Sequence, residues 1–196
     1  FDNSIEKIVS FTPGTYATFR YKESWEMEHR ERYFFPTSYL SLIQFHGSSK
    51  TIEYYMYHFV DRLRQAIRKR VNNCEREIGC LLSGGLDSSI IVSIMSKLVE
   101  PSSIRTFSIG MDGSPDLLAA QKVATYLGTN HTSFIVSEQE MLDAIEPTIQ
   151  QIESFDTTTV RASVPMYLLS KYINEKTNIK VILSGEGFDE LSGSYL

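Results

Sequence analysis

The spacing of apolar residues along this chain alternates between two periods, and the alternation predicts where strands and helices follow one another. Short apolar runs of strand length are followed by stretches in which apolar residues recur every three or four positions, as they do in helices. This alternation is regular from position 51 onward. Residues 1–50 instead contain clustered aromatic residues, a Pro13-Gly14 turn signal and no sustained helical period. We therefore predict a short β-rich segment over 1–50 and an α/β domain over 51–196.

The regular part of the chain predicts four strands separated by helices. Strands are expected at 77–82, 105–109, 131–136 and 179–183. Helices are expected at 51–73, from a glycine-rich turn to about 99, at 115–127, after position 137 and at 160–175. Strands that alternate with helices favour a parallel sheet with right-handed crossovers. The predicted fold is a doubly wound α/β domain, whose ligands bind beyond the carboxyl ends of the strands.

Local signals predict where two of these helices begin and end. Ser114 is a candidate cap for the helix at 115–127, and Gly128 is a candidate stop. Ser137 is a second candidate cap, with Glu140 three residues later completing a capping box.

The Ser83–Ser89 stretch, Ser-Gly-Gly-Leu-Asp-Ser-Ser, follows the first predicted strand of the α/β domain and opens a helix. Adjacent Gly84 and Gly85 allow positive φ and a close approach of a ligand to the backbone. Unpaired amides of a first helical turn, with the hydroxyls of Ser83, Ser88 and Ser89, suit a pyrophosphate group. A lone Ser-Gly-Gly would more often be a capped turn, but here strand, helix and aspartate fall in place together.

The aspartate at position 87 would repel a phosphate unless a cation lies between them. Mg²⁺ prefers one or two carboxylates together with substrate oxygens, so Asp87 predicts a magnesium site. No lysine follows the glycines, so the Walker pattern for γ-phosphoryl transfer is absent. This favours chemistry that releases pyrophosphate.

Three segments directly follow predicted strands: Ser83–Ser89, 110–114 and 184–190. The carboxyl ends of parallel strands meet at one edge of a sheet, so we expect all three to share one cleft. The last segment carries Glu186, Asp189 and Glu190 between glycines, where Asp189 could ligate Mg²⁺ with Asp87 and Glu186 could take a proton. An acidic loop solvated at a strand end is the alternative.

Composition and charge narrow the classes of partner. The formal net charge of −5 argues against general nucleic-acid affinity, and no apolar run is long enough for a membrane span. Cys74 and Cys80 have no partners at zinc spacing, which fits a reducing, cytoplasmic setting. A local basic run is interpreted as the solvated side of a helix; it comprises Arg62, Arg64, Arg68, Lys69, Arg70 and Arg76.

The Ser-Gly-Gly-x-Asp-Ser signature of Ser83–Ser88 resembles that of the PP-loop ATP pyrophosphatases. From about Leu63 to Leu196, the order of further motifs resembles the synthetase domain of glutamine-dependent asparagine synthetases. These motifs are Phe107-Ser108-Ile109-Gly110, Gly113-Ser114-Pro115-Asp116-Leu117, Leu127-Gly128-Thr129, the Asp156–Ser163 segment, Pro165-Met166-Tyr167 and the Leu183–Glu190 segment.

The resemblance implies a role for each matching position. The implied nucleotide pocket includes Leu81, Ser83, Gly84, Gly85, Asp87, Ser88, Ile109, Ser184 and Gly185. Leu81 and Ile109 are equally compatible with a plain core. Glu186 matches the catalytic glutamate and Asp189 its acidic partner. Thr158, Thr159 and Arg161 match part of the aspartate pocket; Arg can pair with a carboxylate in bidentate fashion, although a helix start capped by Thr159 is the alternative.

The implied reaction uses ATP, Mg²⁺ and aspartate to form β-aspartyl-AMP and pyrophosphate, after which glutamine-derived ammonia gives asparagine. Residues 1–50 then resemble the end of a glutaminase domain, and we expect the chain to be an inactive part of a longer polypeptide. A homodimer is compatible with the sequence. The alternatives are a β-lactam synthetase-like enzyme, a non-catalytic nucleotide-binding module and a tRNA-modifying enzyme.

Overall fold

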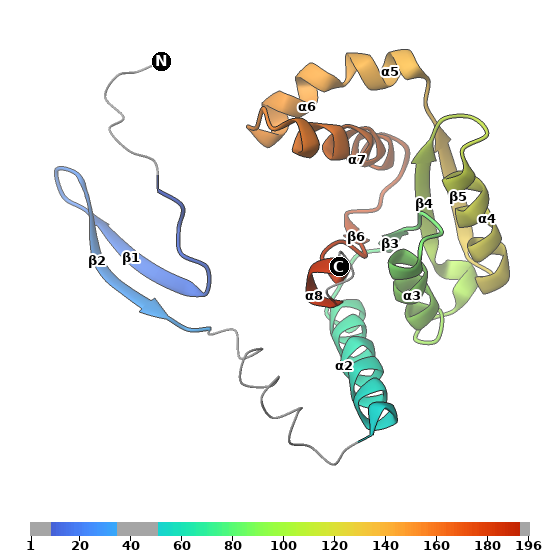
Figure 1. Cartoon of the computed structure of the whole chain (residues 1–196), viewed down its shortest axis with the longest axis horizontal. Coiled ribbons are helices and arrows are strands. Elements are labelled where there is room, and N and C mark those ends of the chain that lie inside the picture. The colour runs from blue at the N-terminus through green and yellow to red at the C-terminus, as the bar shows by residue number, and fades with distance from the viewer. Residues whose placement is uncertain (1–8, 35–50, 193–196) are drawn as a thin grey trace. The chain divides into compact units, whose positions relative to one another are not determined.

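The computed structural model describes residues 9–34 and 51–192, and the side chains up to residue 190. Phe35, which belongs to the aromatic cluster noted in the sequence, lies outside the described residues. The chain divides into two compact units, Phe1–Tyr55 and Met56–Leu196 (Figure 1). Within the described residues, no helix is long and apolar enough to cross a membrane.

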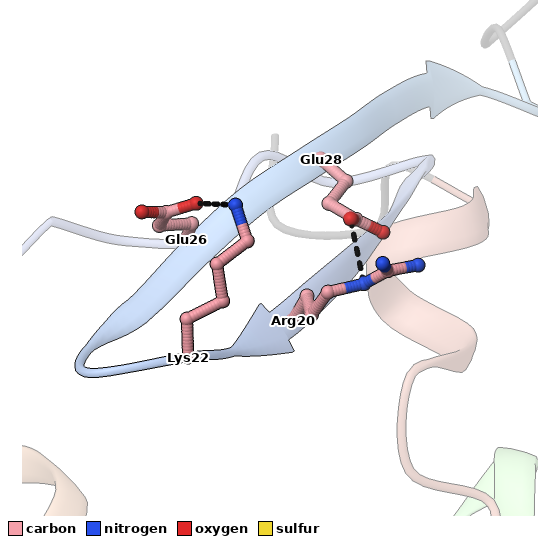
Figure 2. A network of polar contacts seen from close by, with 4 residues as sticks. All are labelled: Arg20, Lys22, Glu26 and Glu28. Carbon is pink, nitrogen blue, oxygen red and sulfur yellow. Dashed lines mark hydrogen bonds and ion pairs between the residues drawn. The ribbon is translucent and has the colours of Figure 1, made fainter.

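The first unit contains an antiparallel hairpin of β1 (Thr15–Tyr21) and β2 (Trp25–Arg32), as expected for its aromatic-rich sequence. The expected turn precedes it: Gly14 has φ +69°, and a Cβ there would lie 2.5 Å from the carbonyl oxygen of Phe34. Every residue of β2 is exposed. Figure 2 shows two ion pairs across this surface, Arg20 with Glu28 and Lys22 with Glu26, at 2.7 and 2.9 Å.

The second unit is built on a four-stranded sheet in which all pairings are parallel. Its strands are β3 (Ile78–Leu81), β4 (Arg105–Gly110), β5 (Asn130–Ile135) and β6 (Val181–Leu183). Their spatial order is β5-β4-β3-β6. The chain therefore starts in the middle of the sheet, adds two strands on one side and then crosses to the other. The order of strands reverses between β3 and β6, which is where open α/β sheets bind ligands.

Helices connect and cover these strands (Figure 1). They are α2 (Ile52–Asn72), α3 (Leu86–Met95), α4 (Pro115–Leu127), α5 (Glu138–Asp143), α6 (Ile145–Ile152), α7 (Thr157–Lys176) and α8 (Phe188–Ser192), with a 3₁₀ turn, η1 (Pro101–Ser103), before β4.

Successive side chains of β3 and β4 point to opposite faces of the sheet, so the core has one part on each face. Cys80 and Leu82 pack with α2, α3 and α4 on one face, where Cys80 is fully buried. Phe107 packs with Leu169 and other residues of α7 on the opposite face. The helices therefore cover both faces, which confirms the doubly wound α/β prediction.

Most predicted elements are present, with ends that shift by a few residues. Gly128 ends α4 in the left-handed conformation, with φ +73°, as predicted. Ser137 and Glu140 form the predicted capping box, in which the Glu140 amide donates to Ser137 Oγ and Glu140 accepts from the Ser137 amide. Ser114 occupies the cap position of α4, but its side chain makes no capping bond.

Three features differ from the expectations. Helix α3 ends at Met95 rather than near position 99, because turns with bonds to Ile94 and Met95 carbonyls replace the last helical turn. The short helices α6 and α8 were not expected. Helix α8 is only five residues long and lies within an acidic loop, so it carries too little apolar periodicity to be recognised.

Candidate functional site

A cleft of about 230 Å³ opens at the carboxyl edge of the sheet, where β3 and β6 meet. It is lined by the turn after β3, the end of β4, the loop after β6, and residues from α4 and α7. The lining residues are Leu81, Leu82, Ser83, Asp87, Ser88, Phe107, Ser108, Ile109, Asp116, Met166, Leu169, Ser184, Gly185, Glu186, Gly187, Asp189 and Glu190.

The serine-glycine turn after β3 is organised by its own hydroxyl groups. Ser88 Oγ accepts from the Ser83 amide at 3.3 Å, lies 3.1 Å from Ser83 Oγ and donates to the Gly85 carbonyl at 3.2 Å. The Gly85 amide donates to Ser83 Oγ at 3.3 Å, so two amides of the turn, those of Ser83 and Gly85, are already engaged internally. No side chain caps α3, which leaves the amides of its first turn available for an anion.

Glycine is required at position 84 for two independent reasons. Its φ is +82°, and an added Cβ would lie 2.5 Å from the backbone carbon of Ala119 in α4. The turn is therefore packed directly against α4. Any residue with a Cβ at position 84 would push the turn and α4 apart.

At Gly185, the loop after β6 lies in close contact with the serine-glycine turn after β3. A Cβ at Gly185 would lie 3.0 Å from the Ser88 amide nitrogen and 3.2 Å from Asp87 Cβ. The loop after β6 thus lies against the start of α3, as the sequence predicted for two strand ends on one edge. The carboxylates of both loops line the same cleft.

The charge lining this cleft is entirely negative. Its described lining residues include the carboxylates Asp87, Asp116, Glu186, Asp189 and Glu190, and none of them is lysine or arginine. Asp87 and Asp189 are half-buried, whereas Glu186 and Glu190 are exposed. A polyanionic ligand would meet strong repulsion here unless cations accompanied it.

Apolar residues also line the cleft. The sequence left open whether Leu81 and Ile109 belong to a nucleotide pocket or to the core. In the structure they belong to both the cleft lining and the core. Each lines the cleft and also packs against the buried cluster of Phe107 and Leu169. Sequence reasoning missed Met166 and Leu169 as lining residues, because nothing local indicates which residues of a distant helix reach the strand ends.

The prediction that the loop after β4 lines the cleft is wrong in detail. Residues 110–114 are not among those that line the cleft. Instead the loop turns back, with the Ser114 amide donating to the Met111 carbonyl at 3.0 Å, and Asp116 in the first turn of α4 faces the cleft. The Pro115 start of α4 was the available signal, since it places residue 116 in a first helical turn.

The threonine-arginine group remains apart from the cleft. Thr158, Thr159 and Arg161 are exposed within the first five residues of α7 and do not line the cleft in the described structure. The cap of α7 is Asp156, which accepts from the Thr159 amide at 2.7 Å and from its hydroxyl at 2.8 Å; Thr159 is therefore the donor to the cap rather than the cap itself. These bonds hold the pKa of Asp156 below its ordinary value.

The described residues hold no cluster of three or more histidine, cysteine or acidic side chains arranged for a metal ion. Asp87 and Asp189 both line the cleft. Two carboxylates suit an ion that completes its shell with phosphate oxygens and water, as Mg²⁺ does.

Comparison with protein families identifies the lineage. A family model described as asparagine synthase matches residues 58–196, which include the whole sheet and its cleft. The chain belongs to the asparagine synthase family. This agrees with the resemblance carried by the sequence motifs.

Curated members of the asparagine synthase family are similar over most of the chain. An asparagine synthetase [glutamine-hydrolyzing] of Gallus gallus is 51% identical over 135 residues, covering 67% of this chain and 24% of that protein. A probable asparagine synthetase [glutamine-hydrolyzing] of Acanthamoeba polyphaga mimivirus is 41% identical and covers 97% of this chain and 36% of that protein. The chain thus spans about a quarter to a third of the length of these relatives.

Among solved structures, the chain is similar to an NH3-dependent NAD synthetase from Campylobacter jejuni, with 16% identity, a TM-score of 0.49 and coverage of 71% of this chain and 60% of that chain. It is also similar to an NMN synthetase from Francisella tularensis, with 18% identity, a TM-score of 0.48 and coverage of 71% and 58%. The fold assignment itself follows from the strand order and pairing described above.

Proposed function

We propose that this chain carries the ATP-binding part of an enzyme that converts aspartate to asparagine through β-aspartyl-AMP, with glutamine as nitrogen donor. Membership of the asparagine synthase family supports the reaction class. The observation that carries the proposal is the convergence of the Ser83–Ser88 turn and the loop after β6 at the point where the strand order reverses.

The proposed first step is adenylation of the substrate. An oxygen of the aspartate side-chain carboxylate attacks the α-phosphorus of ATP, and the bond to the departing pyrophosphate breaks. The hydroxyls of Ser83 and Ser88 and the uncapped amides of α3 stabilise the charge that develops on pyrophosphate. The turn's own hydrogen bonds hold these oxygens in place, and on binding the Ser88 hydrogen turns from the Gly85 carbonyl to the pyrophosphate.

Magnesium fits the charge of the cleft. Acidic side chains such as Asp87, Asp116 and Glu186 line the cleft and would repel ATP, and a divalent cation offsets that repulsion. We propose Asp87 and Asp189 as its protein ligands. Mg²⁺ bound there would neutralise phosphate charge, while Asp87 and Asp189 fix its distance from the serine-glycine turn.

The second step is proposed at Glu186. Ammonia attacks the acyl carbon of the adenylate, AMP leaves with the electron pair of the broken bond, and the excess proton passes to the exposed Glu186 carboxylate. The apolar side chains of Leu81 and Ile109 support contacts to adenine, and backbone groups of Ser184 and Gly185 would read the ring edge. Thr158, Thr159 and Arg161 do not line the cleft in the described structure, and their proposed role in binding the aspartate carboxylates rests on the sequence resemblance.

The setting of the enzyme is also part of the proposal. We propose a cytoplasmic enzyme, since both cysteines are free thiols and Cys80 is fully buried. A homodimer and a glutaminase domain that ends within residues 1–50 complete the proposed assembly, and nucleic acid and membranes are not proposed as partners.

The test is aspartate-dependent exchange of labelled pyrophosphate into ATP, measured on the polypeptide encoded by the complete gene. We expect Asp87→Asn to lower exchange by about a hundredfold, because it weakens stabilisation of the leaving pyrophosphate. Glu186→Gln should retain exchange but lower asparagine formation by about a hundredfold. The matched control is Asp112→Asn, an exposed aspartate that does not line the cleft and should leave both rates unchanged.

Two results would contradict the proposal. Exchange that depends on a different carboxylic acid, such as carboxyethyl-arginine, would point to a β-lactam synthetase-like enzyme. ATP binding without any exchange would indicate a nucleotide-binding module that has no synthetic activity.

A further inference from the structure

A chain of hydroxyl groups and one imidazole lies between β4 and β5, on the face of the sheet opposite Phe107. It is formed by cross-strand neighbours: Thr106 is opposite His131, and Ser108 is opposite Ser133. Thr106 is fully buried and Ser108 is only 5% exposed. Polar side chains at such positions cost stability unless they are hydrogen-bonded, so their bonding partners matter.

Both ring nitrogens of His131 are engaged by hydroxyl groups. Its Nδ1 lies 2.9 Å from Thr106 Oγ1, and its Nε2 lies 3.1 Å from Ser108 Oγ and 3.2 Å from Ser133 Oγ. Thr106 Oγ1 in turn lies 3.2 Å from Thr129 Oγ1. Burial lowers the pKa of His131, which keeps the ring neutral near pH 7, with one nitrogen as donor and the other as acceptor.

One arrangement of hydrogens makes the successive bonds from Thr129 to Ser133 run in the same direction, while the 3.2 Å contact between His131 Nε2 and Ser133 Oγ lies outside this series. Thr129 donates to Thr106, Thr106 donates to His131 Nδ1, and His131 Nε2 donates to Ser108. The Ser108 hydroxyl then keeps its own hydrogen to donate onward, and the structure has it donating to Ser133 Oγ at 3.2 Å. Hydrogen bonds aligned in this way strengthen one another.

Among these hydrogen-bonded side chains, Ser108 is the one that reaches the cleft. It lines the cleft beside Ile109, whereas Thr106, Thr129, His131 and Ser133 do not. The carboxyl end of β4 lies next to β3, whose following turn is the proposed phosphate site. An oxygen of a nucleotide lying across the strand ends would compete with Ser133 for the Ser108 hydrogen.

We propose that Ser108 donates a hydrogen bond to an oxygen of the bound nucleotide and that His131 is the positioning residue that orients the Ser108 hydroxyl for this contact. The inference builds on the proposed function, because it assigns two further residues to the same nucleotide cleft. His131 contacts no ligand; by donating to Ser108 Oγ it commits the Ser108 hydroxyl to the donor role, and on nucleotide binding that hydroxyl exchanges its bond to Ser133 for one to the nucleotide.

The test measures the dissociation constant of Mg-ATP by isothermal titration calorimetry on the polypeptide encoded by the complete gene. Ser108→Ala should weaken ATP binding by about two- to tenfold, the range for one hydrogen bond. His131→Ala should weaken it to a similar extent. In the double variant the loss should equal that of Ser108→Ala alone, because His131 acts only through Ser108.

Two further variants separate positioning from a merely structural role. His131→Gln, which keeps a donor and an acceptor, should recover part of the affinity lost in His131→Ala. Thr132→Val, next to His131 on β5, does not line the cleft and should leave ATP affinity unchanged. Denaturant unfolding of each variant reports any loss of stability separately from the loss of affinity.

The inference is overturned if Ser108→Ala binds ATP as the unchanged protein does, or if the losses from Ser108→Ala and His131→Ala simply add. ATP binding needs no aspartate, so these outcomes are separate from a failure of the pyrophosphate-exchange test. Absence of ATP binding by the unchanged protein would overturn both proposals.

Discussion

The hairpin and the four-stranded sheet use the same strand geometry but differ in what surrounds it. In β2 every residue is exposed, and Trp25 and Tyr21 remain 70% and 63% exposed although they contact each other. In β4, Phe107 is fully buried, and Phe134 stacks on Phe107 and on Tyr172. Pairing of strands occurs in both regions, but in the described structure only the sheet has a core. Burial, rather than backbone pairing, should therefore dominate the stability of each region.

The largest expected effect comes from a phenylalanine in each region. Phe107→Ala should lower the free energy of unfolding of the sheet by about 3–5 kcal/mol, because it leaves a cavity beneath α7. The matched variant Phe19→Ala, at a side chain 48% exposed in β1, should change stability by less than about 1 kcal/mol. Denaturant unfolding measures both. Equal losses would show that the hairpin is buried in the folded protein.

A smaller effect is expected from a glycine in each region. Gly84→Ala combines a positive φ, worth about 1–2 kcal/mol, with a backbone clash at Ala119 worth about 1–3 kcal/mol. It should destabilise the sheet and weaken ATP binding. Gly14→Ala meets a similar clash with the Phe34 carbonyl, but its effect should be confined to the hairpin.

Amide hydrogen exchange distinguishes these glycine variants, because it reports protection for each region separately. The control is Gly113→Ala, which has a positive φ but no atom within 4 Å of the added Cβ. Loss of protection in β3 caused by Gly14→Ala would contradict the separation of the two regions.

The smallest effect is expected from the ion pairs of the hairpin surface. Arg20→Gln removes the 2.7 Å contact with Glu28 (Figure 2), but both side chains are well exposed, at 63% and 37%. Water and salt screen such a pair, so the melting temperature of the sheet should not change and hairpin protection should fall only slightly. Thermal unfolding at low and at high salt checks this. A large, salt-sensitive loss would show that the pair is less exposed than in the structure.

Periodicity was sufficient to locate the elements of the sheet but not their order. The apolar run before Ser83 and the helical spacing after it predicted β3 and α3, since each depends on neighbouring residues alone. The position of β6 beside β3 depends on contacts between segments distant in sequence, for which a single sequence carries no local signal.

The same limit applies to the candidate site. Asp87, Glu186 and Asp189 were recognisable because they follow predicted strands within a few residues. Asp116 and Met166 reach the cleft from α4 and α7, and only the packed structure places them there. From the sequence, Thr159 was one candidate cap of α7, because threonine and aspartate side chains can both cap a helix. In the structure the cap is Asp156, whose carboxylate accepts two bonds where a hydroxyl would typically accept one.

The pairing of β3 with β6 also has a consequence for how the protein matures. Ile78 pairs with Val181, so the pocket closes only after most of this chain has been synthesised and a long segment has folded back. Until then, the turn after β3 has only one neighbouring strand, β4, and the acidic loop that faces it has not arrived. If the cleft binds a nucleotide as proposed, a nascent chain on the ribosome would gain that affinity only once β6 docks beside β3.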